Sequence, residues 1–393
     1  MVQLFSKEES QDWIKVTSSL SPKFASSAVE RDIKSELPDV EIQRLKDTGL
    51  LSLVVPLEYG GVGASWVEAL KIVQEISQAD GSIGQLYGNH LNLTALAHIS
   101  GTSQQKERYY RETAEKNLFW ANAINTRDTR LKITPDGEHY LVNGVTRVDR
   151  GVAIADFRVF AALQDGVEIP LVFVIPQDRD GVFVNKNWEI FSQERADNDT
   201  FIFHNVVIKK DEILGYAYPP NRAVMTFLEI IAQLTTAYVY LGIAEGALAA
   251  ANEYNQSFTR PQNTFGIDKN DSYLIHSYGQ LWTELQAAIA LADQTAIQLQ
   301  KAWEKDIDLN IEARGKIAIA VFATKAFVTQ VSLNITNNIF EVLGNNSAAN
   351  KYNFDKYWRD LRHFILHDPV DYKPRDIGNW LLNQEYPIIT KYS

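Results

Sequence analysis

The stretch FRVFAALQDGVEIPLVFVI, residues 157–175, contains two apolar runs of strand length separated by a turn sequence, Gln164–Asp165–Gly166. Apolar runs this short, divided by Asp-Gly, are typical of strands joined by a tight turn. Neighbouring segments between Phe119 and Ile208 repeat the pattern as HYLVNG, GVFVNKNW and TFIFHNVVI. Short strands at even spacing predict an antiparallel β-barrel or sandwich.

Helical patterns flank this block on both sides. Apolar residues recur at intervals of three and four from Ser10 to about Ile99, and Ser65 is a candidate N-cap. Beyond Tyr218–Pro219–Pro220, the same spacing predicts an antiparallel bundle. Its expected helices are Ala223–Ser257, Ser272–Glu304, Ile311–Leu343 and Phe354–Leu366.

The sequence therefore predicts a mainly helical α+β protein of three domains. We expect an N-terminal helical domain over 1–117, a central β domain over 118–220 and a C-terminal four-helix bundle over 221–393. Large, flat and mostly apolar ligands tend to bind where such unlike domains meet.

The composition excludes several functions. A net charge of −11 argues against a non-specific nucleic-acid binder, because binding phosphates requires clustered cations. The absence of cysteine excludes disulfides, thiolate metal sites and cysteine nucleophiles. We find no signal-peptide layout and no apolar run of membrane-spanning length, so we expect a cytoplasmic protein without membrane partners.

The residues alone leave the chemistry open. His363 and His367 have helical i, i+4 spacing but lack an evident third ligand, so we predict no metal site. His367 stands where a helix should end before Pro369, and either caps the last carbonyl groups or acts in catalysis. Arg260 either binds a phosphate or caps a helix, and Trp188 either packs in the core or lines a flat ligand.

Five stretches together resemble the acyl-CoA dehydrogenase superfamily, and within it the flavin-dependent monooxygenase branch typified by dibenzothiophene monooxygenase. The stretches are GLLSLVVPLEYGG (49–61), ADGSIG (79–84), VYLGIAEG (239–246), FEVLG (340–344) and YWRDLRHFILHDPVDYK (357–373).

The resemblance implies a homotetramer with flavin bound between the β domain and the bundle. It implies FMN rather than FAD, supplied in reduced form by diffusion from a separate reductase. Oxygen transfer to a small apolar or heteroatom-containing substrate would then pass through a flavin C4a-hydroperoxide. The protein would exclude water, hydrogen-bond this species and hold the substrate close.

The resemblance also implies roles for particular residues. His367 matches a catalytic histidine that handles a proton, and Asn122 matches an asparagine that contacts the flavin ring. Arg260 matches an arginine that binds the flavin phosphate, and Trp188 a tryptophan beside the ring. The dehydrogenase base position falls on Asp368 instead of a glutamate, which makes thioester dehydrogenation the weaker interpretation.

Four candidate site positions depart from the branch pattern. Gln85 and Asn89 replace a histidine and a tyrosine, although Asn89 stays a candidate flavin contact. Arg150 stands where a small hydroxyl residue is expected near flavin N5, and Asn346 where a second phosphate arginine is expected.

Arg150 has two physical interpretations. Its charge either stabilises an anionic reduced ring, or it pairs with Asp149 or Asp156 and fills the pocket. Three hypotheses therefore remain: a two-component monooxygenase, a non-catalytic homologue that has lost flavin, and a dehydrogenase-like flavin oxidoreductase.

Overall fold

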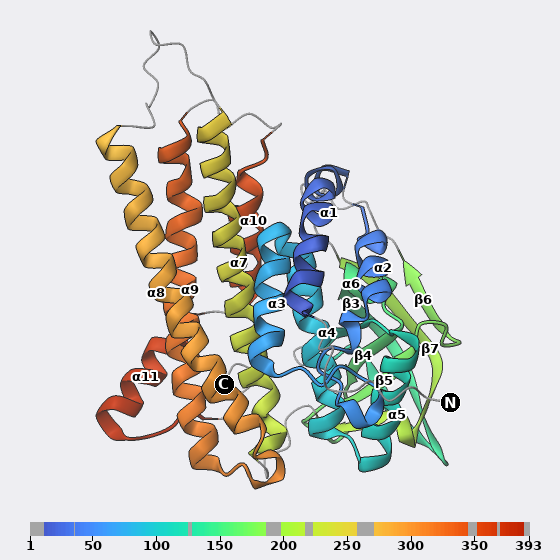
Figure 1. Cartoon of the computed structure of the whole chain (residues 1–393). Helices are drawn as coiled ribbons and strands as arrows, with labels where there is room; N and C mark the ends of the chain where they lie inside the picture. The colour runs from blue at the N-terminus through green and yellow to red at the C-terminus, as the bar shows by residue number, and fades with distance from the viewer. Residues whose placement is uncertain are drawn as a thin grey trace.

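The computed structural model describes most of the chain. The described residues are 12–34, 36–124, 128–185, 198–216, 223–257, 271–344, 352–367 and 370–388. Figure 1 shows three parts: a bundle of long helices on one side, β-sheets on the other, and helices α3 and α4 between them.

Helices form the N-terminal part, as predicted. Their bounds are α1 Trp13–Lys34, α2 Asp39–Thr48, α3 Trp66–Ala79, α4 Gly81–Ser100 and α5 Ser103–Lys116, with 3₁₀ turns at Leu50–Ser52 and Leu57–Tyr59. Ser65 is the N-cap of α3, because its side chain accepts a hydrogen bond from the backbone N–H of Glu68 at 3.2 Å. The reciprocal bond from Ser65 N–H to the Glu68 carboxylate completes a capping box, which confirms the predicted helix start.

Glycines let α3, α4 and α7 pack at backbone contact. A Cβ on Gly242 or Gly246 of α7 would stand 2.3 Å from a carbonyl oxygen of α3. A Cβ on Gly84 of α4 would stand 1.9 Å from the hydroxyl of Ser77. Side chains at these positions would separate the helices, so the glycines fix α4 against the bundle side of the molecule.

Two four-stranded sheets make the β part. Their strand orders are β1-β4-β5-β8 and β2-β3-β7-β6. The bounds are β1 Trp120–Ala123, β2 Lys132–Asp136, β3 His139–Asp149, β4 Phe157–Ala162, β5 Leu171–Pro176, β6 Val182–Asn185, β7 Asn198–Lys209 and β8 Ile213–Tyr216, with helix α6 at Arg150–Ile154 and a 3₁₀ turn at Lys210–Glu212. Phe160 of the first sheet packs edge-on against Phe203 of the second at 5.0 Å, as in the predicted sandwich.

The sheet pairing differs from the prediction in one respect. Strand β1 pairs with β4 in parallel, with Asn122 opposite Val159, whereas the other pairs are antiparallel. Strand β4 is buried along its whole length because Phe157 and Val159 face α4 while Phe160 faces the second sheet. Burial on both faces explains its continuous apolar sequence.

The C-terminal part contains the four predicted bundle helices and one more. Their bounds are α7 Phe227–Ser257, α8 Ser272–Trp303, α9 Ile311–Leu343, α10 Asp355–His367 and the additional α11 Tyr372–Asn383, with 3₁₀ turns at Val224–Thr226 and Asp306–Asp308. The helices start and end within a few residues of their predicted limits. The limits of the three domains themselves stay a prediction.

Two bundle segments, Val224–Gln256 and Ile311–Leu343, are long and apolar enough to cross a membrane by length and composition. The sequence expectation that no such run exists was therefore wrong. Of their most apolar windows, 78% and 61% are buried inside the protein. This burial is that of core helices, whose apolar residues contact neighbouring helices.

Candidate functional site

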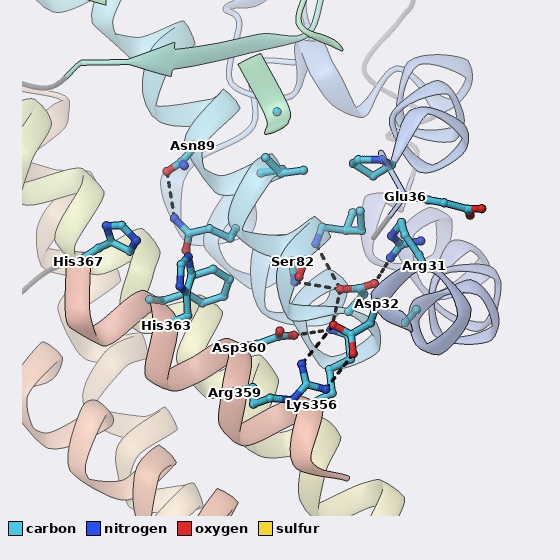
Figure 2. A pocket seen from close by; sticks show the side chains of 18 of the residues that line it. Arg31, Asp32, Glu36, Ser82, Asn89, Lys356, Arg359, Asp360, His363 and His367 are labelled. Carbon is cyan, nitrogen blue, oxygen red and sulfur yellow. Dashed lines mark hydrogen bonds and ion pairs between the residues drawn. The ribbon is translucent and has the colours of Figure 1, made fainter. Parts of the chain in front are cut away.

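A cleft of about 570 Å³ opens between the N-terminal helices and the bundle. Residues of α1, α4, α6, α7 and α10 line it (Figure 2). This volume is typical of small-molecule and cofactor sites, which measure about 300–1,000 Å³.

Helix α10 presents one face to the cleft. Lys356, Asp360, His363 and His367 are spaced four, three and four positions apart and all line it. The His363 and His367 rings lie 4.7 Å apart in an edge-on arrangement. The helix ends at His367, as the following proline predicted.

A chain of buried charges anchors this face of α10. Asp80, whose side chain is fully buried, pairs with Arg31 of α1 and lies 3.4 Å from the ammonium of Lys356. Lys356 also pairs with Asp360 on the next turn. Asp80 is at the same time the N-cap of α4, because its Oδ1 accepts a hydrogen bond from the backbone N–H of Ser82 at 2.9 Å. One carboxylate thus joins α1, α4 and α10.

Among these buried charges, the carboxylates of Asp80 and Asp360 share the ammonium group of Lys356, and the pKa shifts of Lys356 and Asp360 follow from this arrangement. Burial lowers the pKa of Lys356, but Asp360 and Asp80 outweigh it and hold this pKa above its ordinary value. Burial and the neighbouring charge of Asp80 raise the pKa of Asp360 although Lys356 opposes them. We call the cluster of Arg31, Asp32, Asp80, Lys356, Arg359 and Asp360 the charge clamp.

A second branch of the charge clamp joins the start of α10 to α1. Arg359 donates to both oxygens of Asp32, at 3.2 and 2.8 Å, and to Asp355 at 2.7 Å. Figure 2 shows the charge clamp at one end of the cleft and the two histidines at the other.

Two amides of α4 face the histidine end. Gln85 Nε2 donates a hydrogen bond to Asn89 Oδ1 at 3.2 Å, and both residues line the cleft. Gln85 Oε1 is buried and has no hydrogen-bond partner among the described residues. A buried acceptor without a partner is costly and calls for a ligand or water.

Helix α6 reaches the cleft through Gly151. A Cβ on Gly151 would stand 2.4 Å from the end of the Leu86 side chain of α4, so a larger residue here would require Leu86 to move. Arg158 holds α6 in place, because its buried guanidinium donates to the carbonyl oxygens of Ala153 and Gln177 at 2.8 and 3.0 Å.

His90 of α4 is buried outside the cleft lining and joins three elements. Its Nδ1 accepts a hydrogen bond from Trp120 N–H at 3.1 Å, so Nε2 carries the proton and donates to the Leu51 carbonyl at 2.7 Å. Burial lowers the pKa of His90 to about 4, although Leu51 opposes the shift. The neutral ring therefore links α4 to β1 and to a 3₁₀ turn.

The structure brings only part of the predicted site together. Asn89 and His367 line the cleft, and Arg150 begins α6 directly before the lining residue Gly151, although its side chain lies outside the described part. Asn122 is not among the lining residues. The other predicted site residues lie outside the described residues, namely Trp188, Arg260, Asn346 and Asp368.

Asn122 lies near the lining residue Gly151 but outside the cleft lining. Its neighbour Ala121 would be 3.9 Å from a Cβ on Gly151, and its own Oδ1 accepts a hydrogen bond from Ile124 N–H at 3.2 Å.

The charge partner suggested for Arg150, Asp156, lies 2.7 Å from the ammonium of Lys46.

The charge clamp was missed by sequence reasoning. Its signals were present in the Asp-Gly that starts α4 and in the i, i+4 pair of Lys356 and Asp360. Nothing in the sequence paired these residues with Arg31 and Asp32.

Comparison with known proteins places this architecture in one family. Residues 12–117 match the acyl-CoA dehydrogenase N-terminal domain, and residues 234–372 match the acyl-CoA dehydrogenase C-terminal domain. The chain belongs to the acyl-CoA dehydrogenase family, which confirms the resemblance and the fold class.

Within this family, relatives that are 33–39% identical over nearly the whole chain are monooxygenases, and the chain is a flavin-dependent enzyme of that branch. It is 39% identical to dibenzothiophene monooxygenase of Mycolicibacterium goodii, over 96% of this chain and 95% of the relative. It is 33% identical to a probable FMNH2-dependent monooxygenase of Pseudomonas putida, over 95% of each. The FMN-bound crystal structure of TdsC from Paenibacillus sp. A11-2 has a TM-score of 0.89 at 32% identity, covering 98% of this chain and 100% of that one.

Proposed function

We propose that this protein is a two-component monooxygenase that uses reduced FMN, supplied by a separate reductase, to oxygenate a small heteroatom-containing compound. This proposal rests mainly on the cleft, which is lined by Asn89 of α4, Gly151 of α6 and His367 of α10. The names of the relatives, a dibenzothiophene monooxygenase and an FMNH2-dependent monooxygenase, support this chemistry.

The described residues fit the ring end of a flavin. Gly151 and Leu86 lie together in the cleft wall, where a Cβ on Gly151 would stand 2.4 Å from the end of the Leu86 side chain. Leu86 and Phe364 supply apolar surface, while Asn89 supplies a polar group. We assign the phosphate end to Arg260 and Asn346, and the ring flank to Trp188 and Arg150, as the family resemblance implies.

When bound, reduced FMN supplies two electrons to O₂, so that one oxygen atom is added to the substrate and the other leaves as water. Near that ring, His367 holds or delivers the proton at an imidazole nitrogen, with His363 beside it. The sequence-based assignment of Asn122 as a ring contact stays a prediction, since Asn122 does not line the cleft and its Oδ1 accepts a hydrogen bond from Ile124 N–H. Leu86 and Phe364 exclude water.

The assembly and location follow the same proposal. Ile275 and Trp282 of α8 are 59% and 57% exposed and lie seven positions apart on one helix face. Exposed apolar surface of this kind supports a homo-oligomer, which we take to be a tetramer acting in the cytoplasm. Light scattering of the purified protein should give four times the chain mass, and a monomer would contradict this part of the proposal.

Anaerobic titration with reduced FMN tests the central claim. We expect saturable binding, followed by incorporation of one atom from ¹⁸O₂ into an organic sulfide probe when the complex meets oxygen. The variant His367→Gln should bind reduced FMN but lose most of the oxygen transfer, whereas the exposed His276→Gln should behave as the wild type. Absence of reduced-FMN binding would overturn the proposal in favour of a non-catalytic homologue.

A further inference from the structure

Arg158 of β4 is a buried cation that the proposed chemistry does not use. Its guanidinium group donates to two backbone carbonyl oxygens, that of Ala153 at 2.8 Å and that of Gln177 at 3.0 Å. Within the described part of the chain no carboxylate forms an ion pair with it, and Asp156, whose charge acts on it, pairs with Lys46 at 2.7 Å. A charge buried against carbonyl groups costs desolvation, and it holds the groups that it binds in one geometry.

The carbonyl oxygen of Ala153 belongs to α6, a helix that depends on its neighbours for its position. Helix α6 has five residues, which are too few for an isolated helix to form in water. It packs against β1, β3 and β7, and the side-chain amide of Gln177 donates a longer hydrogen bond to the same carbonyl oxygen at 3.4 Å. Arg158 therefore makes the shorter of the two side-chain hydrogen bonds at the C-terminal end of α6, and it joins this end to the residue that follows β5.

We propose that Arg158 is a positioning residue, which acts through α6 to set the cleft wall against which the ring of reduced FMN binds. This inference rests on the proposed function, because it concerns the same cleft and the same cofactor. Helix α6 places Gly151 in that wall, where a Cβ on Gly151 would stand 2.4 Å from Leu86 of α4 and 3.9 Å from Ala121 of β1. A small shift of α6 would therefore move the wall relative to both α4 and β1. The planar guanidinium group binds two carbonyl oxygens at once, which the ammonium group of a lysine cannot reproduce.

Hydrogen exchange on the flavin-free protein tests whether Arg158 holds α6. The variant Arg158→Met keeps an unbranched side chain but removes every donor, so the backbone amides of α6 should exchange about tenfold faster than in the wild type. Arg179→Met is the matched control, because Arg179 also donates to a carbonyl oxygen of the β part, that of Val207 at 3.1 Å, and pairs with Glu212. It should leave the exchange of α6 unchanged. Equal exchange of α6 in the wild type and Arg158→Met would overturn the inference.

Anaerobic titration with reduced FMN tests whether the position of α6 matters for the cofactor. Arg158→Met should weaken binding by about tenfold, because small displacements of a positioning element are costly, whereas Arg179→Met should bind as the wild type does. Arg158→Lys keeps the charge but loses the planar fork, so its binding should stay about threefold weaker than that of the wild type.

The lysine variant separates position from charge. Full recovery of reduced-FMN binding in Arg158→Lys would assign the effect to charge and overturn the inference. Equal weakening in Arg158→Met and Arg179→Met would overturn it as well, since the loss would then follow from general destabilisation. If Arg158→Met does not fold, Arg158→Lys decides both measurements, and wild-type exchange and binding in that variant would contradict the positioning role.

The inference and the proposed function fail separately. Reduced-FMN binding that is equal in the wild type and Arg158→Met would leave the monooxygenase proposal standing and remove the positioning role of Arg158. A wild-type protein that never binds reduced FMN would overturn the proposed function and, with it, the role of Arg158 toward the cofactor. Hydrogen exchange would still show in that case whether Arg158 holds α6.

Discussion

Acid should destabilise this protein through His90. The ring is fully buried, and burial lowers its pKa from 6.5 to about 4. Because the folded protein binds this proton less tightly than the unfolded chain, the stability contributed by His90 is complete above pH 6.5. It is lost as the pH falls toward 4.

The magnitude follows from the two pKa values. The full difference, from 6.5 to about 4, corresponds to about 3.4 kcal/mol, of which about 2 kcal/mol is lost between pH 7.5 and pH 5. Urea unfolding monitored by circular dichroism at both pH values measures this loss. The variant His90→Gln should show a loss smaller by about 2 kcal/mol, since its amide does not titrate.

The exposed His276→Gln is the matched control, because removal of a solvent-exposed imidazole should leave the wild-type pH dependence unchanged. An equal loss in wild type and His90→Gln would refute the reasoning. If His90→Gln does not fold, an NMR titration of the wild type serves instead. A His90 pKa near 6.5 in that titration would refute the reasoning as well.

Three further changes test the buried charges, helix packing and helix capping through the free energy of unfolding. Asp80→Asn keeps the helix cap but removes the charge, and it should cost about 2–4 kcal/mol. A double-mutant cycle with Lys356→Met should give a coupling energy of about 1–3 kcal/mol. A coupling energy below about 0.5 kcal/mol would mean that the two charges act independently. Gly246→Ala places a Cβ 2.3 Å from a carbonyl oxygen of α3 and should lower the free energy of unfolding by about 3 kcal/mol, measured by thermal unfolding. Gly279→Ala is the control, because the space around Gly279 is open, and it should be neutral or stabilise the protein by up to about 1 kcal/mol. Ser65→Ala removes the cap of α3 and should cost about 1 kcal/mol by the same assay; no change would show that the Glu68 side of the capping box suffices.

The fold predictions that the structure confirms rested on local sequence patterns. The spacing of apolar residues located the long bundle helices, and Gly166 of the predicted turn Gln164–Asp165–Gly166 has a positive φ of 79°. The parallel pairing of β1 with β4 was missed, because a four-residue strand contains no information about a partner more than thirty positions away. Helix α11 was missed as well.

The site was predictable only where residues follow one another along a helix. His367 and Asn89 were located through motifs on α10 and α4, and both line the cleft. Asn122, placed on the same grounds, is not among the residues that line the cleft, and its predicted contact with the flavin ring stays a prediction. The ion pairs of the charge clamp connect distant segments, and such pairing depends on the packing of whole helices.

Two partners in the charge clamp, Asp32 and Arg359, are synthesised far apart in time. Arg359 and Asp32 are separated by 327 positions, and α10 begins only at Asp355 of a 393-residue chain. On the ribosome, the N-terminal helices therefore emerge long before the partners of Asp32 exist. We expect a nascent or C-terminally truncated chain to hold an open, acidic surface where the finished enzyme has a cleft. The cleft therefore forms only after α10 has been synthesised and has packed against α1.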